Sequence, residues 1–456
     1  MNTNVMGTEN VRSLMVRLAI PTVVAQLINM MYNIVDRIYI GHIADVGATA
    51  LTGVGLCFPV LMLVNAFASL AGAGGAPRAA IEMGSGNDDR AEYIVGNCFS
   101  ALMGFAVVLT VFFLATATPM LRLFGASDST LPFALDYMRI YVCGTVFVMI
   151  VMGMNPFITT QGFSKFSMLT TVIGAVINII LDPILIFGFG LGVRGAAIAT
   201  VFSQAVSAVW VLRFLRGKKT ILRLRRKHLR LKSRIILPCL ALGISSFVML
   251  STESILNVAF NSSLSRYGGD IAVGAMTIIA SVSQFVLMPL SGICQGAQPI
   301  LSYNYGAGKV KRVREAFFCQ FKICVAYTIL FCIATMALPQ IFAGIFSSDA
   351  DLIAYTTWAM RIYMAGIFSL GFQISCQQSF MALGQAKVSL LLACLRKIIL
   401  LIPLIYILPC FVQNQVCGVF LAEPVSDIIA ASVTVLVFFR RFPKILADAP
   451  AERKAV

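Results

Sequence analysis

Residues 178–190, NIILDPILIFGFG, place an aspartate and a proline inside a long apolar stretch. Asn178 and Asp182 are four residues apart, so on a helix they lie on the same face. Pro183 has no backbone N–H and leaves an upstream carbonyl without its helical donor. Together these oxygens could coordinate Na⁺, or Asp182 could bind and release a proton, because burial favours a neutral carboxyl. The structural alternative is a helix kink whose aspartate is capped by neighbouring amides and hydroxyls.

Two further carboxylates, Asp36 and Glu253, also interrupt apolar stretches. A charged aspartate near the centre of a bilayer costs about 2.5–3.5 kcal/mol on insertion scales, so such groups usually face a cavity or a partner. Intramembrane carboxylates of this kind mark ion and proton pathways. The sequence therefore predicts a cation pathway.

The apolar stretches themselves indicate a membrane protein. Of 456 residues, 59% are hydrophobic and only 12% are charged, whereas soluble domains are about 25% charged. Runs of about 20 apolar residues are long enough to cross a bilayer as helices. We predict an all-α integral membrane protein with twelve transmembrane helices, at about 14–40, 50–78, 93–117, 132–157, 167–189, 194–215, 235–262, 271–303, 315–338, 351–381, 388–410 and 415–439.

Lysine and arginine concentrate in the loops on the side of the two termini, which predicts a multi-pass cell-membrane protein with both termini in the cytoplasm. The densest run, RGKKTILRLRRKHLRLKSR (216–234), could be a nucleic-acid patch. Because it joins two predicted spans, we favour a cytoplasmic loop that fixes topology and contacts anionic lipid. We expect membrane lipid, and no nucleic acid, as a partner.

Metal and nucleotide chemistry are not indicated by the spacing of residues. The twelve cysteines include no CxxC pair, and the two histidines, His42 and His228, are far apart. The chain has no GxxxxGK[ST] motif, so pumping by its own ATP hydrolysis is not expected. We expect no cofactor beyond a coupling ion, no enzyme activity, and a monomer.

The chain contains an internal repeat. Residues 138–141, MRIY, recur at 360–363, a shift of 222 residues that also pairs Gly84 with Gly306 and Gly86 with Gly308. A repeat of six spans gives two parallel lobes, which is a transporter architecture. We predict an N-lobe (1–215), a basic cytoplasmic linker (216–234), a C-lobe (235–440) and a cytoplasmic tail (441–456), with a cleft between the lobes that opens alternately to each side.

The repeat separates scaffold from candidate function. Asp36, Asp182 and Glu253 fall opposite apolar residues in the other half, namely Val258, Leu404 and Met31. A scaffold requirement would be expected in both lobes. The asymmetry of the three carboxylates therefore favours a functional role.

Other polar residues in the predicted spans are weaker candidates. Glu423 and Asp427, four residues apart on the last span, could form a second acidic site in the C-lobe or pair with Arg396 or Lys397. Three amide side chains could line a cavity, namely Asn155, Gln373 and Gln377.

Four segments resemble the multidrug and toxic compound extrusion family, MATE. They are YNIVDRIYIG (32–41), QGFSKFSM (161–168), NIILDPILIFGFGLGVRGAAIAT (178–200) and CQGAQPILSYNYGAG (294–308). The resemblance covers nearly the whole chain and implies cation-coupled export of organic cations and other amphiphilic drugs. It implies a cation-coupling network in the N-lobe, with Na⁺ possible at its first three members, made of Asp36, Asn178, Asp182 and Thr200.

The resemblance also maps an acidic residue of the seventh span onto Glu253. One departure concerns 371–385, GFQISCQQSFMALGQ, which lacks the aspartate that completes a C-lobe sodium site in some members. Asn155 stands where certain members carry an acidic residue, so their drug preferences are not carried over. These differences favour the N-lobe as the coupling site.

The combined prediction is a secondary antiporter that exchanges cationic or amphiphilic drugs for H⁺ or Na⁺ by alternating access. One alternative is a lipid-linked oligosaccharide flippase of the wider superfamily, which would need a cationic cleft for a pyrophosphate. A channel or a membrane enzyme is the other, but no cluster of catalytic residues is seen in the sequence.

Overall fold

The computed structural model describes residues 4–43, 46–347 and 349–451, and these residues form helices and loops without any strand. The helices of the N-terminal half are α1 (Asn4–Thr8), α2 (Val11–Gly41), α3 (Gly47–Leu56), α4 (Phe58–Gly84), α5 (Asp88–Leu123), α6 (Leu131–Cys143), α7 (Thr145–Thr160), α8 (Ser164–Pro183), the π-helix η1 (Ile184–Gly188) and α9 (Val193–Arg216).

A basic segment with one 3₁₀ turn, η2 (Arg226–His228), leads into the C-terminal half. Its helices are α10 (Ser233–Gly306), α11 (Val310–Ala337), α12 (Pro339–Gly344), α13 (Ala350–Tyr363), η3 (Met364–Gly366), α14 (Phe368–Ala382), α15 (Ala386–Cys394), the π-helix η4 (Leu395–Leu401), α16 (Ile402–Ile407), η5 (Leu408–Cys410) and α17 (Gln415–Ala447).

These helices account for the twelve expected spans. Nine described helices are long and apolar enough to cross a membrane, and α6 with α7, bent by 56°, make a tenth span. Helix α10 supplies two spans because Gly269, at φ 67°, breaks its helical geometry; only glycine adopts that conformation readily. Helices α13 and α14 together cover the span expected at 351–381. The all-α membrane fold is confirmed.

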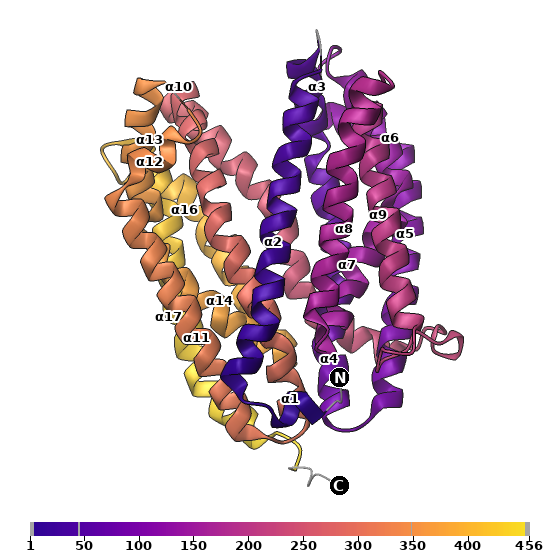
Figure 1. Cartoon of the computed structure of the whole chain (residues 1–456). Coiled ribbons are helices and arrows are strands. Elements are labelled where there is room, and N and C mark those ends of the chain that lie inside the picture. Colours follow the sequence, from indigo (N-terminus) through magenta and orange to yellow (C-terminus); the bar gives the residue numbers. More distant parts are fainter. Residues whose placement is uncertain (1–3, 44–45, 348, 452–456) are drawn as a thin grey trace.

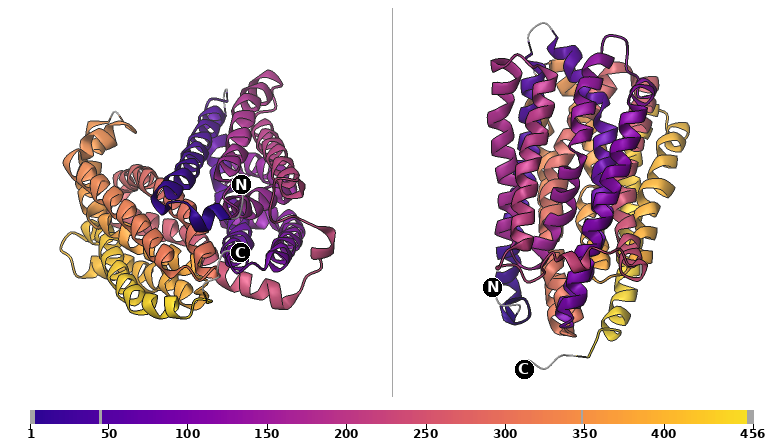
Figure 2. Two further views of the ribbon diagram at one scale, coloured as in Figure 1. Left: turned by 60° about the horizontal axis from the view of Figure 1, so that its bottom comes forward. Right: turned by 90° about the vertical axis from the view of Figure 1, so that its right-hand side faces the viewer.

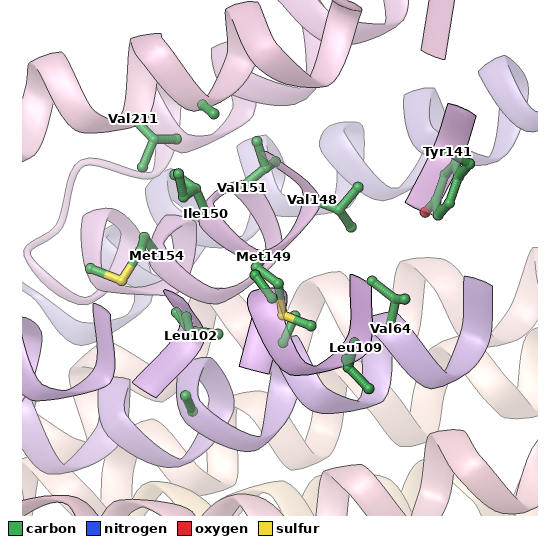
Figure 3. Close-up of a cluster of buried hydrophobic side chains, with 14 of the residues drawn as sticks. Val64, Leu102, Leu109, Tyr141, Val148, Met149, Ile150, Val151, Met154 and Val211 are labelled. Carbon is green, nitrogen blue, oxygen red and sulfur yellow. The ribbon is translucent and has the colours of Figure 1, made fainter. Parts of the chain in front are cut away.

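The two halves form two helical bundles, and both termini lie at the same end of the molecule, which we call the termini end (Figure 1). The left view of Figure 2, turned so that this end comes forward, shows the same two bundles. The N-terminal bundle has its own apolar core between α4, α5, α7 and α9 (Figure 3), which includes Val64, Leu102, Leu109, Met149 and Val211. The C-terminal bundle has separate cores.

The bundles touch closely at the termini end, where the repeat-matched glycines Gly84 and Gly306 face each other's helices. A Cβ on Gly84 would overlap the carbonyl oxygen of Tyr303, and one on Gly306 would overlap that of Ile81. The Ser85 hydroxyl donates to the Gly306 carbonyl at 2.9 Å. In Figure 1 the ribbons of the two bundles diverge toward the opposite end. This conformation is therefore closed at the termini end.

Helix α2 connects the bundles. Its first turns share an apolar core with the C-terminal bundle, where Leu14 and Leu18 cluster with Ala297 of α10 and Phe317 of α11. Its second half packs on α8 of the N-terminal bundle. Pro21 lies between these parts and lacks the N–H of a regular turn. A displacement of one lobe relative to the other must therefore be accommodated along α2.

The segment 217–232 docks on the N-terminal bundle. The Gln161 side-chain oxygen accepts hydrogen bonds from the backbone of Ile221 and Leu222 at 2.7 and 3.0 Å. The Ser100 hydroxyl donates to the Leu229 carbonyl at 2.6 Å. The predicted basic loop is thus a segment held against the bundle.

Candidate functional site

Three of the four predicted coupling residues come together in the N-terminal bundle through direct hydrogen bonds. Asn178 and Asp182 lie one turn apart on α8, and the Asn178 amide donates to Asp182 Oδ1 at 3.3 Å. The same amide nitrogen lies 3.4 Å from the hydroxyl oxygen of Thr200 on α9. All three side chains are buried. Asn178 and Asp182 therefore lie on one face of α8, as their four-residue spacing predicts.

Asp36 completes this group from α2. Its carboxyl group lies near that of Asp182. Two ionised carboxylates at close range repel each other, so a proton or another cation between them would stabilise this arrangement. The structure thus brings all four predicted coupling residues into one site, which we call the N-lobe site.

The N-lobe site has oxygen atoms that make no hydrogen bond. Asp36 Oδ1, Asn178 Oδ1 and Asp182 Oδ2 are each buried and accept no hydrogen bond from a described residue. A buried acceptor without a partner costs roughly 1–3 kcal/mol. Carboxylate and amide oxygens are suitable ligands for hard cations such as Na⁺. These atoms could therefore hold a proton or a sodium ion.

The helix break expected at Pro183 is present. Helix α8 ends at Pro183, and the chain continues as the π-helix η1 before a loop at Gly190 and Gly192 with positive φ. Pro183 cannot donate to the preceding turn, which permits the wider π-turn. Short π-helical segments frequently occur at functional sites. The break follows Asp182 directly and so belongs to the N-lobe site.

Three tyrosines of the N-lobe site were not singled out in the sequence. Tyr32 of α2 and Tyr137 of α6 lie near Asp36, and Tyr137 stacks on Tyr141 at 6.0 Å between ring centroids. Tyr32 precedes Asp36 by four residues, which was an available signal. Tyr137 and Tyr141 come from another span, so no local pattern could assign them.

Three carboxylates within the spans of the C-terminal bundle have basic partners. Glu253 of α10 forms an ion pair with Lys397 of η4. Arg396 Nε lies 2.7 Å from Asp427 Oδ1 of α17, and an Arg396 terminal nitrogen lies 3.3 Å from Glu423 Oε1. We call this group the C-lobe cluster. Of the two possibilities left open for Glu423 and Asp427, the structure shows pairing with Arg396.

The π-helix η4 places two consecutive basic residues inside the bundle. Arg396 and Lys397 are only 5% and 8% exposed, although neighbours on a regular helix point in different directions. Arg396 reaches α17 and Lys397 reaches α10. Three carboxylates therefore face two basic groups in the C-lobe cluster, which leaves an acidic excess.

The predicted cavity residues are engaged in local hydrogen bonds in this conformation. The Asn155 amide donates to the Ser167 carbonyl at 3.3 Å. Gln373 and Gln377 are 1% and 2% exposed, and the Gln373 amide donates to the Gln377 side-chain oxygen at 3.4 Å. Their role as cavity lining stays a prediction.

Comparisons with known proteins assign the chain's relatives. A family model described as MatE matches residues 21–184 and again 245–407. The multidrug export protein MepA of Staphylococcus saprophyticus is 24% identical over 398 residues, which cover 86% of each protein. MepA of Staphylococcus aureus strain MSSA476 is 24% identical over 401 residues, with the same coverage.

Solved structures share the fold. A MATE crystal structure in the straight conformation superimposes with a TM-score of 0.91 at 23% identity, covering 98% of this chain and 99% of that chain. The outward-facing conformation of a multidrug resistance MATE family transporter of the MOP superfamily gives a TM-score of 0.90 at 23% identity, covering 98% of this chain and 99% of that one. At this identity the likeness establishes the fold alone.

Proposed function

The chain belongs to the MatE family of membrane transporters, and from this premise we propose that it is a secondary multidrug exporter. It exchanges organic cations and other amphiphilic drugs for H⁺ or Na⁺. The observation that carries the coupling proposal is the set of buried N-lobe oxygens that accept no hydrogen bond from a described residue, at Asp36, Asn178 and Asp182.

The termini end is assigned to the cytoplasm. The basic segments 216–234 and 309–314 both lie at this end, and cytoplasmic loops carry an excess of Lys and Arg (Figure 1). With this orientation, the conformation described above is closed to the cytoplasm. An ion from outside then reaches the N-lobe site while the drug leaves.

The proposed cycle depends on reciprocal binding of ion and drug. A proton or Na⁺ between Asp36 and Asp182 removes the repulsion between their carboxylates and draws α2 toward α8. Because the first turns of α2 pack on the other lobe, a change at Asp36 is transmitted across the interface near Pro21. An ion that favours the drug-releasing conformation weakens drug binding. By linkage, the drug weakens binding of the ion by the same factor.

The charge of the C-lobe cluster favours a cationic cargo. Three carboxylates face two basic groups there, and the carboxylate side chain of Glu253 is 43% exposed. A lipid-linked pyrophosphate would need the opposite surplus. The lipid-flippase alternative therefore receives no support from this cluster.

The test is efflux of a fluorescent organic cation from proteoliposomes that contain the full chain. One arm applies an acid-outside pH gradient without sodium, and the other applies an inward sodium gradient without a pH difference. Efflux driven by either gradient supports the proposal and identifies the ion. Efflux that is the same with and without gradients, or no efflux in either arm, contradicts it.

A further inference from the structure

A second group of polar side chains lies at the cytoplasmic end, away from the N-lobe site and the C-lobe cluster. Asp89 and Glu92, on the first turns of α5, meet His228 of the docked linker segment. One ligand atom from each side chain lies within 4.8 Å of the other two, and His228 Nδ1 is 3.6 Å from Glu92 Oε2. Residues 136 positions apart in the sequence thus converge on one point.

The buried members of this group have unused ligand atoms. The His228 side chain is fully buried and that of Glu92 is 5% exposed. Neither ring nitrogen of His228 makes a hydrogen bond to a described residue. Glu92 Oε2 forms an ion pair with Arg225, and Glu92 Oε1 accepts from the Arg223 backbone N–H at 3.1 Å. Buried polar atoms normally have partners, so the two ring nitrogens of His228 need an explanation.

The histidine is held rigidly in place by its backbone. The Asn97 amide donates to the His228 carbonyl at 3.2 Å, and Asn97 Oδ1 accepts from the Lys232 backbone N–H at 2.6 Å. The linker lies so close to α5 that a Cβ on Gly96 would fall 2.5 Å from the His228 carbonyl oxygen. The Tyr93 ring packs against the imidazole of His228, with 4.0 Å between the ring centroids. The imidazole therefore keeps its orientation toward Glu92.

We propose that Asp89, Glu92 and His228 form a binding site for a divalent transition-metal ion of the Zn²⁺ type. One imidazole nitrogen and two carboxylate oxygens are a ligand set that suits Zn²⁺ and its neighbours in the first row. Asp89 is exposed and gives the ion a route from the cytosol, with a water molecule as fourth ligand. Because His228 lies in the linker and the carboxylates in α5, the bound ion fixes the linker to the N-lobe.

The surrounding charges set the strength of this site. Burial and the Lys227 ammonium lower the pKa of His228, which favours the neutral ring that offers a nitrogen lone pair to a metal. Arg225 Nε lies 2.9 Å from Glu92 Oε2 and competes with the metal for that oxygen. Removal of this competitor by Arg225→Gln tightens metal binding.

The first measurement is zinc X-ray absorption on the purified full chain after chelator treatment and addition of one equivalent of Zn²⁺. The site requires a first shell of nitrogen and oxygen at about 2.0–2.1 Å. A sulfur shell at about 2.3 Å would mean that the metal sits on one of the twelve cysteines, which overturns the assignment. This experiment needs no variant and so does not depend on the folding of one.

Matched variants then locate the site by equilibrium dialysis and metal analysis. His228→Ala and Glu92→Gln lose the bound equivalent, while His42→Ala, which removes the exposed second histidine, retains it. Zn²⁺ also slows tryptic cleavage within residues 216–234 of the wild type but not of Glu92→Gln. Retention of the metal by His228→Ala, or its loss from His42→Ala, would show that this group is not the site.

Discussion

The N-lobe and the C-lobe both place carboxylates beside a π-helical segment, and the two π-helices lie in spans that the repeat relates. In the N-lobe, η1 begins just after Asp182 and Pro183. Three side-chain oxygens of the N-lobe site accept no hydrogen bond from described residues. In the C-lobe, η4 carries Arg396 and Lys397, which pair with all three carboxylates of the cluster. The same backbone device thus lies beside carboxylates without a basic partner in one lobe and beside carboxylates paired with basic residues in the other.

The difference has an energetic consequence. A buried ion pair is self-contained, and removing one member leaves an uncompensated charge that costs several kcal/mol. A buried carboxylate pair without a basic partner is instead stabilised by binding an external cation. We therefore expect substitutions in the C-lobe cluster to affect stability first, and substitutions in the N-lobe site to affect coupling first.

The largest expected effect is from Asp182→Asn. The amide keeps the shape of the side chain but cannot ionise, so the coupling between gradient and drug flux, typically 5–150-fold in such systems (about 1–3 kcal/mol), is lost. Thermal stability stays the same or rises, because an unsatisfied buried acid is removed. Gradient-driven efflux and a melting curve measure the two properties; a strong fall in melting temperature would count against the assignment.

The next largest is a loss of folding stability in Arg396→Met. Glu423 and Asp427 would then be buried without their basic partner, which costs about 3–5 kcal/mol. Denaturant unfolding in detergent measures this loss. The exposed Arg194–Asp136 pair supplies the control, because Arg194→Met there changes stability little. Equal effects of the two substitutions would show that the C-lobe cluster is not a structural unit.

A smaller effect, equal in the two lobes, is expected where the bundles touch at the termini end. Gly84 and Gly306 play equivalent parts, so Gly84→Leu and Gly306→Leu should each destabilise the closed conformation by about 1–3 kcal/mol through overpacking. Spin labels on unnatural amino acids at Asn87 and Lys311 should report longer distances in both variants. A shift in only one variant would show that the lobes are not symmetric at this contact.

The smallest expected effect is from Thr200→Ala. This change removes one hydroxyl within 3.4 Å of the Asn178 amide, and a single hydrogen bond is worth about 0.5–1.5 kcal/mol, or about 2–10-fold in ion affinity. The apparent affinity for the driving ion measures it. An effect as large as that of Asp182→Asn would place Thr200 among the direct ion ligands.

Much of the fold could be predicted from composition, because a bilayer accepts few structures other than apolar helices. The placement of Asn178 beside Asp182 followed from helical spacing alone, and the break at Pro183 followed from its missing N–H. Thr200 could be assigned through the resemblance to a family, since its partner lies on another helix.

The remaining features depend on contacts between distant segments. Nothing local indicates that Lys397 meets Glu253, or that η4 turns two neighbouring basic residues inward. The absence of a CxxC pair argued against a metal site, whereas His228 reaches Asp89 and Glu92 only because the linker docks on α5. Spacing rules detect ligands that are close in sequence, and these are not.

The most direct test compares two double substitutions, one in each lobe, in the same efflux assay. Asp36→Asn/Asp182→Asn removes the N-lobe carboxylates, and Glu253→Gln/Lys397→Gln removes one C-lobe pair as a unit without changing net charge. The account predicts that the first double variant loses all response to the ion gradient while the second remains gradient-driven. Gradient-driven efflux in the N-lobe variant, with its loss in the C-lobe variant, would contradict the assignment of coupling to the N-lobe.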